Sequence, residues 1–322
     1  HSQDRPSRPE GIPAVPGMVR WIMRIIVAGA SGLIGTALSS TLRSAGHDVG
    51  TLVRRPPAAP SEFQWNPAEG SIDDTALKGA DAVINLSGAG IGDRPWTRAR
   101  ISELRSSRLA ATGTLTAAMG RLDIPPAVFL SQSASGYYGS AGPAVLRENA
   151  PPGGGVLARI CVDWEAAAHE APAGVRVVTP RTGVVLSRSG GALGRLMPLL
   201  RLGVGGPLGN GRQYWPWITL PDVSGAFVFL LGSELSGPVN VCAPESADVN
   251  SLIAQLAGAL HRPAVFRVPA PVLRLVMGQL ADELLLASQR MEPAALSAAG
   301  FVWQHPSLAQ AAAWVAERGP KT

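Results

Sequence analysis

Three glycines spaced three residues apart stand near the start of the chain and suit the binding of a diphosphate. Gly29, Gly32 and Gly35 follow the apolar run Ile25–Ala28 and open a segment with helical spacing. In such a motif the first glycine allows a tight turn, the second lets the backbone approach a pyrophosphate, and the third allows close packing of helix on strand. Free N–H groups at the start of the helix then attract the phosphates. An ordinary glycine turn is the alternative interpretation.

Two arginines after the next apolar run indicate which dinucleotide would bind. The run Asp48–Val53 is followed by Arg54 and Arg55, and no acidic residue occurs in residues 50–61. An NAD site places a carboxylate near this point to hold the ribose 2′-hydroxyl, whereas an arginine accommodates a 2′-phosphate. We therefore expect NADP(H) as the cofactor, with the hydroxyl of Ser31 on the same phosphate. The alternative is that these arginines lie at the surface without a ligand.

The elements that must position these residues follow an alternating pattern. Short β-branched runs alternate with helical stretches, which predicts a parallel sheet covered on both faces. The expected fold class is α/β, a doubly wound parallel Rossmann sheet with a smaller, mainly helical C-terminal substrate-side region. The expected strands are Ile25–Ala28, Asp48–Val53, Ala82–Leu86, Ala127–Ser131, Val175–Thr179 and Pro238–Cys242.

Composition shifts along the chain suggest where the parts begin and end. Residues 1–22 are predicted to form a flexible tail because they are rich in proline and charge without periodicity. Glycines and prolines crowd residues 183–216, which predicts loops that build a cleft. Later segments such as Asp282–Ser288 and Leu308–Ala316 have a helical composition. The expected NADP-binding domain is 23–180 plus 220–243, and the expected substrate-side region is 181–219 plus 244–318.

The charge balance argues for a small-molecule partner. The chain has 28 Lys and Arg residues against 23 Asp and Glu, and only Lys78 and Lys321 among the basic residues are lysines. The arginines are spread along the chain, which is typical of a solvated basic surface. Nucleic-acid binding therefore rests on net charge alone, and we expect no nucleic-acid partner.

The sequence also argues against a membrane partner, a disulfide and a metal site. No uninterrupted apolar run reaches the roughly 18 residues that a membrane span requires, so we expect no membrane partner. The two cysteines, Cys161 and Cys242, lie far apart, which favours a reducing cytoplasm over a disulfide. The five histidines lack metal-ligand spacing, so we expect no metal.

Several motifs in order resemble one family of oxidoreductases. The glycine loop, Asn85–Ala89 and Ser131–Gly139 together look like an extended short-chain dehydrogenase/reductase, in its atypical, epimerase-like branch. Trp65–Pro67, Cys161–Glu165, Trp215–Ile218 and Glu283–Arg290 support the resemblance, which runs from about Met23 to Val315. The cofactor-binding residues that loop and resemblance imply are Gly29, Ala30, Ser31, Gly32, Leu33, Ile34, Arg54, Arg55, Leu86, Ser87, Gly88, Ala89 and Gly183.

The usual acid–base pair of that family is missing from this sequence. Most members use a Tyr and a Lys four residues later, because the Lys lowers the pKa of the Tyr hydroxyl. Neither lysine here lies four residues beyond any tyrosine. When the family pattern is counted back from Glu165, Leu157 falls at the Tyr position and Cys161 at the Lys position. The atypical branch resembles this arrangement.

The remaining catalytic candidates come from the resemblance. Ser133 aligns with the family's catalytic serine, and Tyr137 or Tyr138 could supply a proton from the same loop. Arg108 falls where other members carry a helix Asn, and a fixed cation there could hold an anionic substrate or stabilise an oxyanion. Cys161, with an ordinary thiol, cannot replace a positive charge. The structural alternatives are a strand-end serine, a helix-face salt bridge for Arg108 and a small packing residue for Cys161.

Two functions follow from these features and both stay open. The first is an NADP-dependent, epimerase-like oxidoreductase acting on a small anionic or sugar-nucleotide-like substrate. The second is a non-catalytic NADPH-sensing or scaffold protein, which the missing Tyr–Lys pair would permit. A homodimer is an open alternative to a monomer. Ligand contacts near the cleft could come from Arg195, Arg201, Arg212, Trp215 and Trp217, although the tryptophans could equally pack in the core.

Overall fold

A nine-stranded sheet forms the centre of the molecule. The computed structural model describes residues 22–188 and 190–317, so nearly all of the expected tail lies outside the described residues. The strand order is β13-β9-β6-β5-β1-β2-β3-β4, with β7 paired to β9; among the described residues of this sheet, β3 and β4 pair antiparallel and the other pairs are parallel. The strands are β1 (Arg24–Ala28), β2 (Asp48–Val53), β3 (Glu62–Asn66), β4 (Ser71–Ile72), β5 (Ala82–Asn85), β6 (Val128–Ser131), β7 (Ser133–Ala134), β9 (Arg176–Thr182) and β13 (Gly237–Val241). The doubly wound sheet is confirmed.

The strand order places a crevice at the carboxyl end of β1. This strand pairs with β2 on one side and β5 on the other, so the order of strands reverses there. Open α/β sheets bind ligands in the crevice outside the strand ends at such a switch point. The glycine loop leaves β1 at this end, and the Leu86–Ala89 segment leaves β5 beside it.

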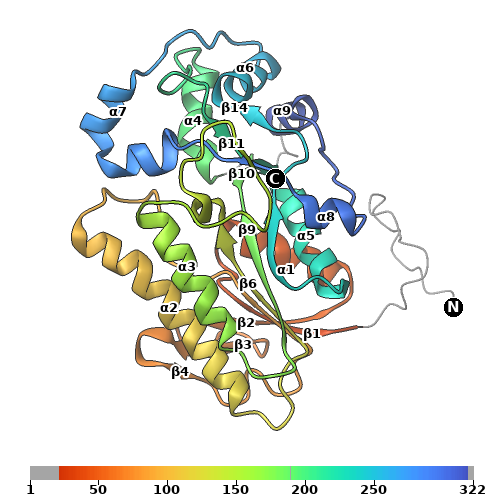
Figure 1. The fold of residues 1–322 in the computed structure, drawn as a ribbon. Helices are drawn as coiled ribbons and strands as arrows, with labels where there is room; N and C mark the ends of the chain where they lie inside the picture. The colour runs from red at the N-terminus through yellow and green to blue at the C-terminus, as the bar shows by residue number, and fades with distance from the viewer. Residues whose placement is uncertain (1–21, 189, 318–322) are drawn as a thin grey trace, which may run out of the picture.

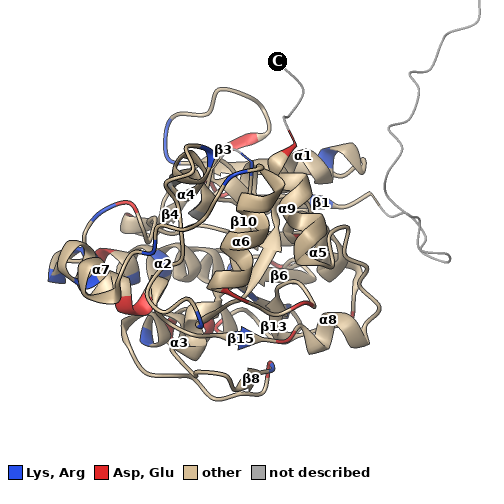
Figure 2. Cartoon of the chain, turned by 90° about the horizontal axis from the view of Figure 1, so that it is seen from above, with Lys and Arg blue, Asp and Glu red and all other residues tan. Residues whose placement is uncertain are grey.

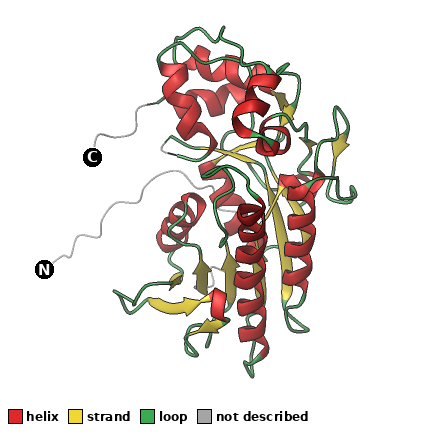
Figure 3. Cartoon of the chain, turned by 90° about the vertical axis from the view of Figure 1, so that its left-hand side faces the viewer, coloured by secondary structure: helices red, strands yellow, loops and turns green. Residues whose placement is uncertain are grey.

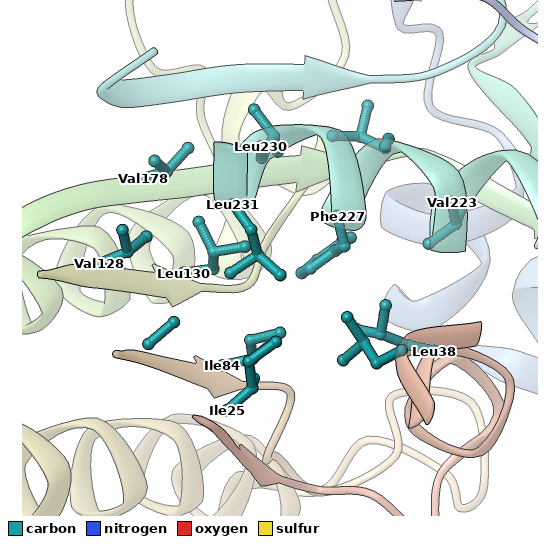
Figure 4. Packing of buried hydrophobic residues seen from close by; sticks show 14 of the residues in the cluster. Ile25, Leu38, Ile84, Val128, Leu130, Val178, Val223, Phe227, Leu230 and Leu231 are labelled. Atoms are coloured by element: carbon teal, nitrogen blue, oxygen red, sulfur yellow. The ribbon is translucent and has the colours of Figure 1, made fainter. Parts of the chain in front are cut away.

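Helices cover both faces of the sheet, and alternate residues of β1 point to opposite faces. Ile25 and Val27 pack with the helices on one face, whereas Ile26 and Ala28 pack with those on the other. Figure 4 shows Ile25 near Ile84 and below Phe227 in the first of these cores. The covering helices are α1 (Leu33–Ser44) and α5 (Leu220–Gly232) on one face, and α2 (Arg98–Gly120) and α3 (Val156–His169) on the other (Figure 1).

A smaller, mainly helical lobe lies above the carboxyl ends of the strands (Figures 1 and 3). Its own core contains Trp217, Leu252 and Leu256, and both Trp215 and Trp217 belong to it. The helices of the lobe are α4 (Ala192–Arg201), α6 (Val249–Ala259), α7 (Ala270–Met277) and α9 (Leu308–Ala316). The remaining elements are η1 (Pro67–Glu69), η2 (Ser135–Tyr138), β8 (Val145–Leu146), β10 (Val184–Leu186), β11 (Tyr214–Trp215), β12 (Trp217–Thr219), β14 (Ala247–Asp248), η3 (Ala281–Leu285), β15 (Arg290–Met291) and α8 (Ala294–Ala298).

Several segments differ from the sequence-based expectation, and one is residues 183–216, where helix α4 lies among the predicted loops. Strand β3 was not expected, because Glu62–Asn66 alternates polar and aromatic residues at the sheet edge. Strand β9 runs past Pro180 to Thr182, since its last residues pair with β7 on one side and β13 on the other. The expected helical segment Asp282–Ser288 is confirmed only in part, because the π-helical turn η3 ends at Leu285. Ser288 instead bonds to the loop around Gly142.

Charged residues of both signs are interspersed over the fold in the view of Figure 2. Within the described ranges, no helix combines the length and hydropathy needed to cross a bilayer. The same residues contain no group of three or more His, Cys, Asp or Glu side chains arranged to hold a metal ion.

Candidate functional site

The glycine loop has the backbone geometry that the motif predicts. Gly29 has a φ of 80°, which favours glycine, and a Cβ there would lie 2.7 Å from the carbonyl carbon of Leu86. A side chain at Gly35 would collide with the carbonyl oxygen of Gly29. At Gly32 an added Cβ would meet only that same oxygen, at 3.4 Å. The first and third glycines therefore close the turn, while the second faces open space.

The start of α1 is built to receive an anion. Gly32 caps the helix without a side-chain hydrogen bond, and the first turn contains no acidic residue. Ser31 and Gly32 are both exposed. The uncapped N–H groups and the positive end of the helix dipole favour a negatively charged ligand. Together with the open face at Gly32, this geometry fits the diphosphate of a dinucleotide.

The segment Leu86–Ala89 lies against the glycine loop, as the resemblance implies. The N–H of Leu86 donates to the carbonyl of Ala28, which continues the β1–β5 pairing. Asn85 fixes the turn that follows, because its side-chain oxygen accepts from the N–H of Ser87 at 3.1 Å. A Cβ on Gly88 would lie 3.1 Å from the guanidinium carbon of Arg108. Glycine at position 88 therefore makes room for that arginine.

The two arginines after β2 differ in their partners. Arg55 donates two hydrogen bonds to Glu62 of β3, at 2.6 and 2.8 Å, and Glu62 in turn accepts from the N–H of Ala58. Bonding to Arg55 lowers the pKa of the Glu62 carboxyl to about 2. Arg54 is exposed, and no ion pair of its side chain is recorded among the described residues. The sequence did not reveal this difference, because Glu62 stands on a strand that was not expected.

A cavity of about 260 Å³ opens between the sheet, α2, α3 and the C-terminal lobe. Its lining contains two of the five catalytic candidates, Arg108 and Cys161, and the cofactor candidate Gly183. Trp215 also contributes to the wall while its indole N–H donates to the carbonyl of Leu285 at 3.2 Å. The structure thus brings residues far apart in the sequence to one site.

Arg108 is a buried cation that has no acidic partner in the described part of the chain. Its side chain is 7% exposed, and it donates to the backbone carbonyl of Leu104 at 2.8 Å. Its guanidinium carbon lies 5.0 Å from the ring centre of Trp164. Burial lowers the pKa of Arg108, and no described carboxylate forms an ion pair with it. The helix-face salt bridge considered from the sequence is therefore wrong for this residue.

Cys161 keeps its proton under ordinary conditions. The thiol is buried on α3, 3.8 Å from the carbonyl oxygen of Ala134. Burial, reinforced by the charge of Glu165, raises the pKa of the Cys161 thiol to about 12. A thiolate nucleophile at this position is therefore disfavoured, and the residue lines the cavity as a small neutral group.

Ser133 does not face the cavity. Its side chain is fully buried, and its hydroxyl donates to Glu165 at 2.6 Å. The neighbouring Ala134 and Ser135 line the cavity instead. This placement differs from the sequence-based expectation that the Ser133 hydroxyl would meet a substrate, and that role stays a prediction. The physical reason is that β7 alternates its side chains, so Ser133 points toward α3 and its carboxylate.

Tyr137 and Tyr138 also differ from their expected role, because both contact Arg181. The Tyr138 hydroxyl donates to Asn240 at 2.7 Å and accepts from Arg181 at 2.9 Å. Burial raises the pKa of Tyr138 to about 12. Tyr137 presents its ring face 3.4 Å from the guanidinium carbon of Arg181. Neither tyrosine is among the residues that line the cavity.

Arg181 is the centre of a buried polar cluster that the sequence did not predict. Its guanidinium donates to both oxygens of Glu165, at 2.8 and 2.7 Å. Burial alone would lower the Arg181 pKa, but the hydrogen bonds and charge of Glu165 outweigh it and raise that pKa. We call Ser133, Tyr138, Glu165, Arg181 and Asn240 the Arg181 cluster. Glu165, one helical turn after Cys161, was the sequence feature that could have indicated this cluster. Its partner Arg181 lies on a separate element, β9, so their pairing could not be predicted.

Glu283 is a second cavity residue that sequence reasoning missed. This residue of η3 accepts from the backbone N–H groups of Val156 and Leu157, at 2.9 and 2.8 Å, and so caps the start of α3. Gly155, just before the helix, leaves room for the carboxylate, since a Cβ there would lie 3.0 Å from it. The cap joins the C-terminal lobe to the sheet-covering helix beside the cavity.

Gly183 and the cleft arginines complete the placement of the expected residues. Gly183 lines the cavity, and a Cβ there would collide with the carbonyl oxygen of Pro216. Close backbone packing, independent of any ligand, is thus enough to require glycine. Arg201 and Arg212 are exposed and do not line the cavity. The side chain of Arg195 lies outside the described part.

The switch-point crevice, the glycine loop and the uncapped helix define a dinucleotide-binding Rossmann protein of the extended short-chain dehydrogenase/reductase type. Comparison with known proteins places the chain more narrowly. The model of the NAD dependent epimerase/dehydratase family matches residues 25–242. A second model, a domain of unknown function called DUF1731, matches residues 268–315. The chain belongs to the NAD dependent epimerase/dehydratase family.

Relatives match over nearly their whole length. An epimerase family protein of Mycobacterium bovis is 43% identical over 296 residues, covering 91% of this chain and 98% of the relative. The human epimerase family protein SDR39U1 is 35% identical, covering 90% and 98%. The crystal structure of an isoform of that human protein with NADPH matches with a TM-score of 0.84 and 33% identity, covering 91% and 99%.

Proposed function

We propose that the chain is an NADP(H)-dependent, epimerase-like oxidoreductase that acts on a small anionic substrate. The observation that carries this proposal is Arg108, a buried cation in the wall of the cavity with no acidic partner among the residues that the structure describes. A buried charge is costly unless it is compensated, so such a side chain is suited to an anionic ligand. The Tyr–Lys pair is not needed for this binding step.

Cofactor choice in the proposal rests on Arg54. Its exposed guanidinium follows β2, where a ribose 2′-phosphate would lie in this fold, and it has no recorded ion pair among the described residues. The human relative was crystallised with NADPH, which supports the same choice. The cofactor would supply hydride at the nicotinamide, and Arg108 would hold the substrate's negative charge or a developing oxyanion.

A titration followed by an isotope transfer experiment tests the proposal. We expect tighter binding of NADPH than of NADH, followed by deuterium transfer from C4-deuterated NADPH to a carbonyl acid. Arg108→Met should abolish the transfer and leave the NADPH affinity unchanged, and Arg105→Met on the same helix is the matched control because its side chain pairs with Asp163 at the surface. Tighter binding of NADH than of NADPH would contradict the cofactor assignment.

The second candidate is a non-catalytic NADPH-sensing or scaffold protein. The observation that favours it is the Arg181 cluster, since the hydroxyls of Ser133 and Tyr138 are both engaged in buried hydrogen bonds. Tight NADPH binding without hydride transfer to any carbonyl acid would favour this candidate over the oxidoreductase.

A further inference from the structure

The cavity contains one positive and one negative side chain. Among the described residues that line it, Arg108 and Glu283 are the charged ones, and Cys161 remains a neutral thiol. Glu283 is held in place by two backbone N–H donors at the start of α3. A ligand entering the cavity therefore meets a single cation and a fixed carboxylate.

Arg108 has hydrogen-bond donors to spare. A guanidinium carries five N–H donors in a planar fork that matches a carboxylate. One nitrogen of the Arg108 guanidinium donates a hydrogen bond to the carbonyl of Leu104. The Trp164 ring packs near the guanidinium and restricts its orientation. Arg108 is therefore suited to bind one carboxylate group.

The same charges disfavour a diphosphate in this cavity. A sugar nucleotide carries two negative charges on its diphosphate, and such groups are usually held by several cations or clustered N–H donors. Here a second cation is absent from the described lining, and the carboxylate of Glu283 would repel the second negative charge. Charge balance thus favours a monoanion.

The size and walls of the cavity point in the same direction. Its volume of about 260 Å³ lies below the range of roughly 300–1,000 Å³ typical of pockets for drug-sized ligands. Most of the wall is apolar, with neutral amides at Gln132 and Gln289. The apolar lining includes Ile91, Leu104, Leu157, Ile160, Trp164 and Leu284. A compact ligand with an apolar body fits these walls.

We infer that the substrate site takes a compact monocarboxylate with an apolar body, with its carboxylate on Arg108, and that it does not take a sugar nucleotide. The inference rests on the proposed function, because it gives the chemical class of that substrate. It adds that Glu283 acts as a specificity-determining residue by excluding polyanions. Two features of the cavity, its charge pattern and its volume, support the same class.

Calorimetric titration of the full chain saturated with NADP⁺ tests the inference. The probes are 3-benzoylpropionate, hydrocinnamate and hexanoate, each paired with its neutral amide, together with UDP-glucose. At least one acid should bind about 10- to 100-fold more tightly than its amide. The reason is that only the carboxylate of the acid can form a charge-assisted hydrogen bond with the Arg108 guanidinium. UDP-glucose should neither bind more tightly than that acid nor displace it.

Variants separate Arg108 from Glu283. Arg108→Met should reduce the affinity for the acid by a similar factor and leave the amide unaffected, whereas Arg105→Met should change neither. Glu283→Gln should raise the affinity for UDP-glucose relative to the acid while the backbone cap is partly kept. Because the wild-type comparison of acid with amide needs no variant, a misfolded Arg108→Met protein would not prevent the test.

Three results would overturn the inference: tighter binding of UDP-glucose than of every acid, equal binding of each acid and its amide, or no binding of any acid. These outcomes are separate from the fate of the proposed function, which is read from hydride transfer. Acid binding without hydride transfer would support the ligand class and reject the oxidoreductase. Hydride transfer to a sugar nucleotide would support the oxidoreductase and reject the monocarboxylate ligand class.

Discussion

Arg181 and Arg108 are both buried arginines, but within the described ranges only Arg181 has a carboxylate partner. Arg181 is 3% exposed and donates to both oxygens of Glu165. Arg108 is 7% exposed and donates to a single backbone carbonyl beside the cavity. The first charge is compensated by a carboxylate within the fold, whereas the second has no carboxylate partner among the described residues. Burial of a cation therefore does not by itself indicate a binding site, and the absence of a compensating carboxylate among the described residues is the more informative feature.

The largest expected effect comes from breaking the compensated pair. Glu165→Gln should lower the free energy of unfolding by about 3–5 kcal/mol, because Arg181 would remain buried and charged without its carboxylate. Urea denaturation followed by circular dichroism would measure the loss. Asp163→Asn on the same helix is the control; its pair with Arg105 is partly exposed, so the expected loss is below about 1 kcal/mol. Equal losses in the two variants would refute the distinction.

A smaller loss of stability is expected at the edge of the same cluster. Tyr138→Phe should cost about 1–3 kcal/mol, since the side-chain oxygen of Asn240 would lose its buried donor. The pKa of Tyr138 is raised by burial to about 12, so the folded state keeps its proton where an unfolded tyrosine, near 10, loses it. Wild-type stability should therefore fall as the pH rises from about 10 to 12, and less steeply in the variant. The same dependence of stability on pH in the wild type and in Tyr138→Phe would contradict the raised pKa of the Tyr138 hydroxyl.

Arg108→Met should change stability far less than Glu165→Gln. No carboxylate is left unpaired, and a desolvated charge is removed, so the free energy of unfolding should stay within about 1 kcal/mol of the wild-type value. The same denaturation experiment, in the absence of ligand, measures it. A loss as large as that of Glu165→Gln would mean that Arg108 is a structural cation after all.

The same contrast recurs at the surface between Arg54 and Arg55, where the expected effect is on cofactor affinity and not on stability. Arg55 is held by Glu62, whereas Arg54 has no ion pair recorded in the described part of the chain. Arg54→Gln should weaken NADPH binding by about tenfold and leave NADH binding unchanged, because the 2′-phosphate loses a charged donor. Fluorescence titration would measure both affinities. A larger effect of Arg55→Gln would reverse the assignment of the two side chains.

The sheet was predictable because its signals are local. Buried parallel strands show as continuous apolar runs, so five of the six expected strands matched within a residue or two, and only Val175–Thr179 ended early. The edge strand β3 was missed because half of its residues face solvent and carry polar side chains. The turn at η3 was mistaken for an ordinary helix, since composition does not reveal hydrogen-bond register.

The glycine loop could be identified from local sequence, because the positive φ of Gly29 and the close approach of Gly35 to the Gly29 carbonyl both belong to the turn that joins β1 to α1. The sequence by itself also determined that the Tyr–Lys pair is missing, which requires only spacing. The partners of the other polar side chains depend on tertiary packing and could not be predicted from local sequence. Ser133 and Tyr138 bond into the Arg181 cluster, whereas Arg108 is left facing the cavity. A buried charge or hydroxyl is stable only when a partner compensates it, and these partners come from strands and helices far away in the sequence.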